Sequence, residues 1–373
     1  MKRTLLITVD FAPQVGGVAN YLAGLTKNLP AGDLVVLAPK VKANFDNQFK
    51  FKIYRRNLFW RFWPKWLPMV YQIFKIARAE KVEFLWAAQP LPVGSAIYLV
   101  SRLLGLPYLV NTHGMDVAGP LNAGGRRLKI LKRVLGAAKL ITVNSDATKK
   151  LVLKLTNQPD KILKIYPCPE LLSPSSPDRE NRITTKHGLG GKKVLLTVGR
   201  LVKRKGHEAV IQALPEVLKT VPNLIYLIAG DGENKANLLE LIKRLNLGKF
   251  VILAGQVAKE DLPAYYRACS AFIMPSQELA GGDIEGFGLV FLEAGLYGKP
   301  VIAGQTGGQA EAVLNNQTGL LVDPADTAAI AEAIIKLLTD ESLARQLGES
   351  GRSRAEKDFK WETEARRLEK FLK

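Results

Sequence analysis

Short apolar runs rich in β-branched residues alternate along this chain with longer segments of helical periodicity. This alternation limits the possible folds more than any other feature, because it is typical of βα units wound around parallel sheets. The pattern forms two successive series. Since 373 residues also exceed the size at which one hydrophobic core usually suffices, we predict two α/β domains.

In the first series the expected strands are 5–9, 34–37, 84–87, 108–111 and 140–143, and the expected helices are 18–27, 68–80, 94–104 and 126–135. In the second series the expected strands are 194–198, 224–229, 251–253, 272–274 and 301–303, with helices between them. Open parallel sheets bind ligands beyond the carboxyl ends of their strands. We therefore expect two Rossmann-like domains whose ligand-binding crevices face each other across a cleft.

A stretch rich in proline and serine, 171–177, separates the two series and has the composition of a linker. We expect an N-terminal domain over 1–173 and a C-terminal domain over 174–360. A last helix, 361–373, could pack on either domain, including back on the first.

The formal net charge of +19 is concentrated in the first half of the chain. Residues 1–173 hold 26 Lys and Arg against 9 Asp and Glu, whereas the rest hold 27 against 25. Such a field attracts nucleic acid, anionic lipid or phosphorylated substrates, and by itself it does not choose among them.

Cysteine usage and hydropathy exclude several other classes of protein. Cys168 and Cys269 are far apart and lack CxxC partners, which argues against a disulfide framework or a zinc site. The most apolar stretch, 85–110, is interrupted by polar residues and prolines, so we expect no transmembrane helix. The N-terminus leads into a strand followed by Asp10 rather than into a signal-peptide core, and we expect a cytoplasmic protein.

The loop after the first expected strand contains Gly16 and Gly17 and leads directly into a helix. Adjacent glycines let a ligand approach the backbone, and a helix N-terminus offers free N–H groups to a phosphate. A tight turn without a ligand would look the same. The spacing is not GxGxxG, which argues against a dinucleotide oxidoreductase.

Four basic residues follow the first strand of the second series: Arg200, Lys203, Arg204 and Lys205. Arg200 could bind a diphosphate through its planar guanidinium and Lys205 as a point charge. A solvated basic loop is the alternative, and the position after a strand favours ligand binding.

A glycine-flanked turn that begins at Glu285 feeds an apolar helix, and Glu293 lies two turns further along it. A carboxylate within an apolar run is costly unless it is paired or bound to a ligand. Carboxylates suit sugar and ribose hydroxyls because each accepts several hydrogen bonds. The alternative makes Glu285 a helix cap and Glu293 a member of a buried ion pair.

Over nearly its whole length the sequence resembles the retaining GT-B glycosyltransferases of family 4. The resemblance rests on five motifs: Glu285-x7-Glu293, Gly199-Arg200-x4-Lys205, Gly16-Gly17, Asn111-Thr112-His113-Gly114 and Gly298-Lys299-Pro300-Val301-Ile302-Ala303. The chain departs from the family in one place: it has Pro167-Cys168-Pro169-Glu170 where many relatives have Pro-x-Gly-Val-Asp.

The resemblance implies two overlapping sets of site residues. The groups expected to act at the reacting sugar and diphosphate are His113, Arg200, Lys205 and Glu285. The groups expected to bind the donor are Gly16, Gly17, Arg200, Lys205, Val257, Glu285, Gly286, Phe287, Gly288, Leu289 and Glu293.

Within these sets the resemblance gives Arg200 and Lys205 the donor diphosphate, Glu293 the ribose, and Glu285 and His113 the transferred sugar. It also implies a mechanism without a metal or other cofactor, in which basic side chains and helix dipoles stabilise the leaving diphosphate. Retention in this family is ascribed to attack on the same face of the sugar, and we assign no protein nucleophile.

The stretch 280–288 looks most like mannosyltransferases that transfer mannose from GDP-mannose to phosphatidylinositol mannosides. We therefore expect GDP-mannose as donor in preference to UDP-sugars, and a lipid-linked or glycan acceptor. The alternative is a UDP-sugar-dependent enzyme of the same family that acts on a soluble or polysaccharide acceptor.

Between Lys50 and Lys81 nine basic residues accompany the single acid Glu80, and nine aromatic residues are interleaved with them. Together with a second basic cluster, 126–133, this mixture suits an anionic membrane surface. We expect peripheral association with the inner face of the plasma membrane through the first domain. The alternative places the aromatics in the core and leaves the charges solvated. A nucleic-acid-binding protein would also be basic, but that reading leaves the glycine loops and paired glutamates unexplained, so we expect no nucleic-acid partner.

Overall fold

The computed structural model describes residues 1–14, 16–41, 46–62, 64–170 and 176–373. It divides into two compact units. The first unit comprises Met1–Cys168, Gly281–Gly286 and Phe359–Lys373, and the second comprises Pro169–Ala280 and Phe287–Asp358. Most of the predicted linker, and the predicted boundary between 173 and 174, fall in 171–175, outside the described residues.

The first unit is built on a seven-stranded parallel sheet with the strand order β3-β2-β1-β4-β5-β6-β7. Its strands are β1 (Thr4–Ile7), β2 (Leu34–Pro39), β3 (Lys52–Arg56), β4 (Phe84–Ala87), β5 (Tyr108–Thr112), β6 (Leu140–Val143) and β7 (Ile162–Lys164). The apolar pattern predicted five of these and missed β3 and β7. Both are edge strands, only partly buried, and edge strands need no continuous apolar run.

The helices that belong to this unit are α1 (Gly17–Lys27), α2 (Leu67–Ala79), α3 (Val93–Leu104), α4 (Met115–Ala123), α5 (Gly125–Ala137), α6 (Asp146–Leu153) and α15 (Trp361–Leu372). Sequence periodicity missed α4 and α6. The first contains Pro120 near its end, and the second is short, capped by the Ser145 side chain, which accepts a hydrogen bond from the Thr148 N–H group. Short helices of this kind are specified by caps and tertiary packing more than by periodicity.

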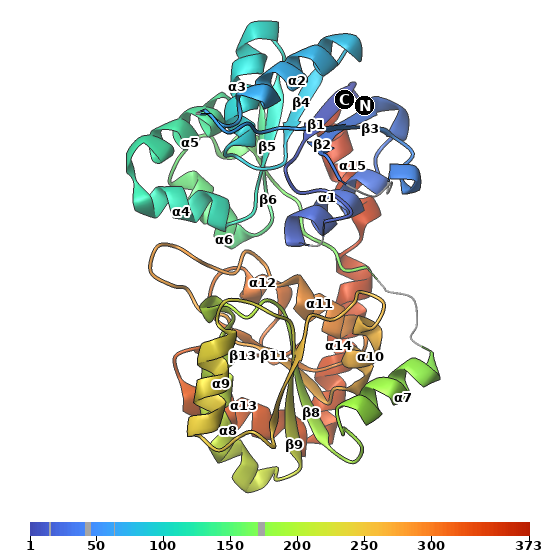
Figure 1. The fold of residues 1–373 in the computed structure, drawn as a ribbon, viewed down its shortest axis with the longest axis vertical. Helices are drawn as coiled ribbons and strands as arrows, with labels where there is room; N and C mark the ends of the chain where they lie inside the picture. The colour runs from blue at the N-terminus through green and yellow to red at the C-terminus, as the bar shows by residue number, and fades with distance from the viewer. Residues whose placement is uncertain (15, 42–45, 63, 171–175) are drawn as a thin grey trace. The chain divides into compact units, whose positions relative to one another are not determined.

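The C-terminal helix α15 packs on α1, next to the N-terminal strand. The backbone N–H of Lys2 donates to the carbonyl of Leu372 over 2.9 Å, so the two ends of the chain lie side by side (Figure 1). Within α15, Glu364 is buried and accepts hydrogen bonds from Arg367 and from the backbone of Tyr166. The last residues are therefore an integral part of the first unit.

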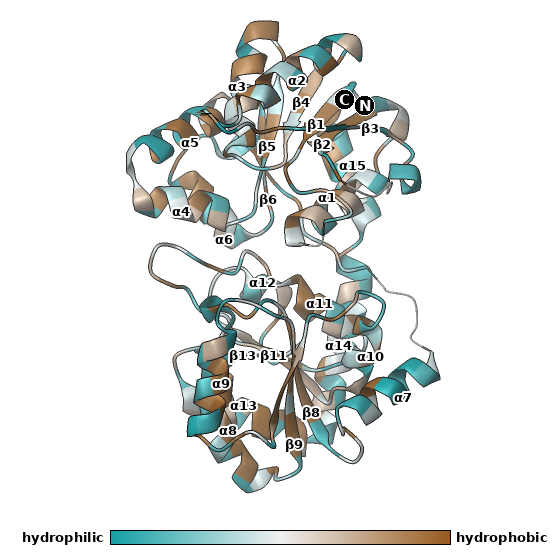
Figure 2. Ribbon diagram, in the orientation of Figure 1, coloured by the Kyte–Doolittle hydropathy of each residue, from teal (hydrophilic) through white to brown (hydrophobic). Residues whose placement is uncertain are grey.

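The second unit contains a six-stranded parallel sheet with the order β10-β9-β8-β11-β12-β13. Its strands are β8 (Lys193–Val198), β9 (Leu224–Ala229), β10 (Val251–Gly255), β11 (Ala271–Met274), β12 (Val301–Gly304) and β13 (Leu320–Val322). Its helices are α7 (Pro177–Lys186), α8 (His207–Thr220), α9 (Lys235–Arg244), α10 (Leu262–Ala268), α11 (Leu289–Leu296), α12 (Gln309–Ala312), α13 (Thr327–Thr339) and α14 (Glu341–Asp358). The strands are mainly hydrophobic and α7 mainly hydrophilic (Figure 2).

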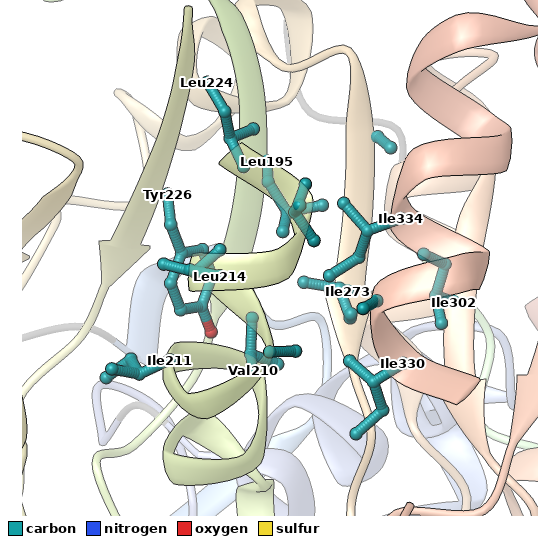
Figure 3. Close-up of a cluster of buried hydrophobic side chains, with 14 of the residues drawn as sticks. Leu195, Val210, Ile211, Leu214, Leu224, Tyr226, Ile273, Ile302, Ile330 and Ile334 are labelled. Atoms are coloured by element: carbon teal, nitrogen blue, oxygen red, sulfur yellow. The ribbon is translucent and has the colours of Figure 1, made fainter. Parts of the chain in front are cut away.

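The core of the second unit lies between the sheet and the helices α8 and α13. Leu214 of α8 and Ile334 of α13 meet Leu195 and Ile273 of the strands in one fully buried cluster (Figure 3). Dense packing of this kind fixes the strand ends, where the predicted site residues lie. No helix in the described part of the chain combines the length and apolar character needed to cross a bilayer.

Candidate active site

In the first unit, Gly16 ends the loop that follows β1 and Gly17 opens α1, at the point where the strand order changes direction between β1 and β4. This switch point is the usual ligand-binding position in a doubly wound sheet. Gly16 is the extended N-cap of α1, and a Cβ added to either glycine would meet none of the described residues within 4 Å. Packing against the described part of the chain therefore does not require these glycines, whereas close approach of a ligand would. Their neighbour Val15 lies outside the described residues.

His113 follows β5 and is held from several sides. Its Nε2 lies 3.1 Å from the carbonyl oxygen of Ala88, and its ring meets the ring of Tyr21 edge-on at 5.3 Å. Its backbone N–H donates to the carboxylate of Asp116 over 2.9 Å. Because a carbonyl can only accept, Nε2 carries a proton, which leaves Nδ1 as the acceptor in the neutral ring.

Glu285 lies beside the His113 loop because the next residue, Gly286, packs directly against that loop. A Cβ at position 286 would lie 2.3 Å from the carbonyl oxygen of His113. Nearby, Gly282 has a φ of 80° and no room for a Cβ next to Asn122. The segment Gly281–Gly286 is accordingly part of the first unit, although the rest of its motif continues into the second.

In the second unit, the basic loop after β8 is tightly packed and is not merely a solvated charge cluster. Gly206 ends it with a φ of 76°, and a Cβ there would lie 2.2 Å from the carbonyl oxygen of Pro275. Arg204 is buried, Lys205 is half-buried and Arg200 is exposed. The packing thus separates the four cations that the sequence places side by side.

The sequence patterns did not predict His207, whose side chain contacts the backbone of this loop. Its Nε2 lies 3.3 Å from the carbonyl oxygen of Arg200. Burial lowers the pKa of His207 to about 4, so the ring is neutral near pH 7 and donates to that carbonyl. The ring therefore fixes the backbone of Arg200 without adding a charge.

Glu293 projects from α11, whose N-cap is Gly288 with a φ of 93°. The Tyr266 hydroxyl donates to Glu293 Oε2 over 2.7 Å. Burial raises the pKa of Glu293, while the Tyr266 hydrogen bond and the positive charges of Lys259 and Lys205 oppose the rise. Glu293 makes no ion pair within the described part of the chain, so the structure does not support the ion-pair alternative.

The remaining predicted donor residues lie at the same edge of the second sheet. Phe287 is buried just before α11, Leu289 is its first residue, and Val257 is half-buried after β10. Because Leu289 opens the helix, the first backbone N–H groups of α11 have no i−4 carbonyl within the helix and can bind an anion, whereas the N–H of Phe291 already donates to the carbonyl of Gly288.

Gln309, in α12, is a second residue near the site that the sequence patterns did not predict. Its buried side-chain oxygen accepts from the N–H groups of Ser276 and Gly304, and its amide nitrogen donates to the carbonyl of Ser276 over 2.9 Å. It thereby joins the ends of β11 and β12. Sequence alone gives no sign of this role, because a buried glutamine and a solvated one look alike.

We expect Glu293→Gln to stabilise the fold and weaken nucleotide binding. The raised pKa means that the unfolded state loses this proton first, so stability falls as pH rises through the window between the unfolded and folded pKa values. The amide removes that cost near pH 7 but loses the charged acceptor, and affinity should fall about 10- to 100-fold. Thermal unfolding between pH 4 and 8, and calorimetric titration with GDP and UDP, measure the two effects.

Glu349→Gln, an exposed change on α14, is the control and should alter neither quantity. Unchanged nucleotide affinity in Glu293→Gln would contradict a ribose-binding role.

The chain has two Rossmann-like units. In the second unit, cations follow the first strand and the carboxylate of Glu293 projects from the apolar helix α11. This combination is that of a GT-B sugar transferase. Residues 179–354 match the family model "Glycosyl transferases group 1", and residues 15–168 match "Glycosyltransferase Family 4". The chain belongs to glycosyltransferase family 4 and is a glycosyltransferase.

Two relatives of established name match along their whole length. "GDP-mannose-dependent alpha-(1-6)-phosphatidylinositol monomannoside mannosyltransferase" of Mycolicibacterium smegmatis is 32% identical, over 99% of this chain and 97% of that protein. The enzyme of the same name from Mycobacterium tuberculosis is 31% identical, over 100% and 98%. Among solved structures, Anabaena HepE in complex with UDP-glucose has a TM-score of 0.83 at 22% identity, over 99% of both chains, and shows the shared fold.

Proposed function

We propose that the protein transfers mannose from GDP-mannose to a phosphatidylinositol-type glycolipid, with retention at the anomeric carbon and without a metal ion. The observation that carries the proposal is the similarity above 30% to GDP-mannose-dependent mannosyltransferases over the full chain. A UDP-sugar donor is the second candidate, because HepE has the same fold and was solved with UDP-glucose.

The donor half of the reaction is assigned to the second unit. In the proposed mechanism Arg200 and Lys205 neutralise the diphosphate as the bond from the anomeric carbon to its oxygen breaks, and the N–H groups at the start of α11 add hydrogen bonds. Glu293 holds the ribose hydroxyls. No three His, Cys, Asp or Glu side chains gather at a potential metal site among the described residues.

The transferred sugar is assigned to residues of the first unit. Glu285 lies beside the His113 loop, where it can accept hydrogen bonds from sugar hydroxyls. The fixed ring and backbone of His113 supply a second contact. Neither group is assigned as a nucleophile.

The acceptor side is proposed to lie on an anionic membrane at the inner face of the plasma membrane. Four aromatic side chains between residues 50 and 81 are exposed, which supports this proposal: Phe59, Trp60, Phe62 and Tyr71. Phe51, in contrast, is buried. Of the eleven exposed large hydrophobic residues among those described, seven lie between Phe59 and Leu103. A cationic surface with exposed aromatics favours anionic bilayers.

Stabilisation by sugar nucleotides tests the donor. GDP-mannose at a hundredfold excess over its Kd should add about 2.7 kcal/mol to the free energy of unfolding, visible as a rise in Tm, whereas UDP-glucose and UDP-N-acetylglucosamine should add little. A larger rise with a UDP-sugar would favour the second candidate.

Transfer of radiolabelled mannose to phosphatidylinositol lipids then tests the acceptor. Flotation with anionic vesicles but not neutral ones tests the membrane, and equal flotation would contradict it.

A further inference from the structure

A groove of about 950 Å³ opens on the first unit between α3, α5 and the segment that leads into α2. Its apolar lining includes Leu91, Tyr98, Ile130 and Val134. The helices α3 and α5 can approach closely at Val134 because position 94 is glycine, where a Cβ would lie 2.7 Å from a Val134 methyl group. The groove lies outside the proposed sugar and nucleotide contacts, and the mechanism does not use it.

The lining also carries a concentrated positive charge. Five of the described lining residues are Lys or Arg and none is Asp or Glu: Lys65, Arg126, Arg127, Lys129 and Arg133. Three of them lie in the first residues of α5, whose first turn contains no acidic side chain. Positive charge at a helix N-terminus opposes the helix dipole, whereas an anion bound there is attracted by both the dipole and the cations. A negatively charged ligand would neutralise the cations and complement the dipole together.

The occupant must therefore combine an apolar body with an anionic end. A nucleotide or sugar phosphate satisfies the cations but leaves the apolar lining uncovered, and a neutral lipid does the reverse. The exposed apolar side chains around the groove, including Phe59 and Leu99 on its wall and Leu103 beyond it, extend the apolar surface outward. That continuity suits a chain that reaches the groove from a membrane.

We propose that this groove binds one acyl chain of an anionic glycerophospholipid of the membrane, with the lipid phosphate held by the α5 cations that line the groove, from Arg126 to Arg133. The inference rests on the proposed action at a membrane and adds a defined lipid site to it. Binding of one lipid molecule would orient the first unit on the bilayer, beyond the non-specific attraction of its charge.

Short-chain phosphatidylglycerol, used as a monomer below its micellar concentration, tests the site by calorimetric titration on the full-length protein. We expect saturable binding of one lipid per protein, about tenfold tighter for each two methylenes that enter the groove. The neutral short-chain phosphatidylcholine should bind at least tenfold more weakly. Inorganic phosphate that bound as tightly as the lipid would overturn the acyl-chain assignment.

Two matched pairs of variants separate the groove from its surroundings. Ser95→Trp places an indole in the groove from α3, whereas Leu103→Trp places one on the exposed surface of the same helix. We expect the first to abolish lipid binding and the second to preserve it. Wild-type affinity in Ser95→Trp would overturn the proposal.

The second pair makes the same change of charge at adjacent positions of α5. Arg133 lines the groove and Lys132 does not. Arg133→Glu should weaken binding at least tenfold and Lys132→Glu less than threefold, and equal losses would mean a diffuse electrostatic attraction and would overturn the site. The Tm rise with GDP-mannose, measured on all four variants, shows that each is folded. Lipid binding in the groove without any mannosyl transfer would refute the proposed function and support the lipid site. Mannosyl transfer without lipid binding in the groove would support the proposed function and refute the lipid site.

Discussion

Lys205→Ala is expected to lower kcat for sugar transfer about a hundred- to a thousandfold. Negative charge develops on the diphosphate as the glycosidic bond breaks, and the loss of one preorganised charge donor at such a position has an effect of this size. Lys205 is half-buried in a loop that Gly206 and Pro275 hold rigidly. Burial raises the pKa of Glu293 and the positive charge of Lys205 opposes this rise, so the two side chains act on the same region of the second unit.

Steady-state kinetics with GDP-mannose and a short-chain lipid acceptor provide the measurement. Lys203→Ala is the matched control, because Lys203 belongs to the same basic loop but its side chain is exposed. The control should keep kcat within about twofold. A Lys205→Ala enzyme with a raised KM and an unchanged kcat would show that the lysine binds the ground state and the transition state equally, and would refute the role in stabilising the leaving group.

The sequence predicted those parts of the fold that depend on local apolar patterns. The buried strands β4 and β9 occur at the predicted residues, because a strand covered on both faces is a continuous apolar run. The apolar pattern did not predict the edge strands β3 and β7. For example, β3 has the sequence Lys-Ile-Tyr-Arg-Arg and is only partly buried. Their pairing is set by neighbours distant in sequence.

The site shows the same division. The sequence predicted the glycine turns and the charged residues after the strands as candidate site residues, because a loop that binds phosphate needs a flexible backbone and positive charge. The partners that position these residues were not visible. Tyr266, which holds Glu293, lies in an apolar helix and looks like an ordinary core residue, and the burial of Arg204 between two more accessible lysines leaves no mark in the sequence. Nor does the pattern show that Gly286 packs against His113, a contact between segments far apart in the chain.

Trp361→Ala is expected to destabilise the first unit by about 3–5 kcal/mol. Trp361 is 8% exposed and meets the ring of Tyr21 edge-on at 5.6 Å. Its Nε1 has no hydrogen-bond partner in the described part of the chain, so its contribution is packing. Because Tyr21 also meets the ring of His113, the cavity would loosen a group at the proposed active site. Thermal unfolding should show a fall in Tm of about 10 °C, and Trp361→Phe should recover most of it.

Gly24 tests the same contact from the other helix. A Cβ at this position would lie 2.2 Å from the Trp361 ring, and overpacking of this kind costs about 1–3 kcal/mol. Gly136→Ala is the matched control, because position 136 lies within α5 and a Cβ there would meet no described residue within 4 Å. The higher helix propensity of alanine should add about 0.5–1 kcal/mol to the free energy of unfolding. Opposite signs for the two substitutions would place the stabilising contact between α1 and α15. If Gly24→Ala were as stable as Gly136→Ala, the C-terminal helix would not be packed on α1 in solution, and the support it gives His113 through Tyr21 would fall with it.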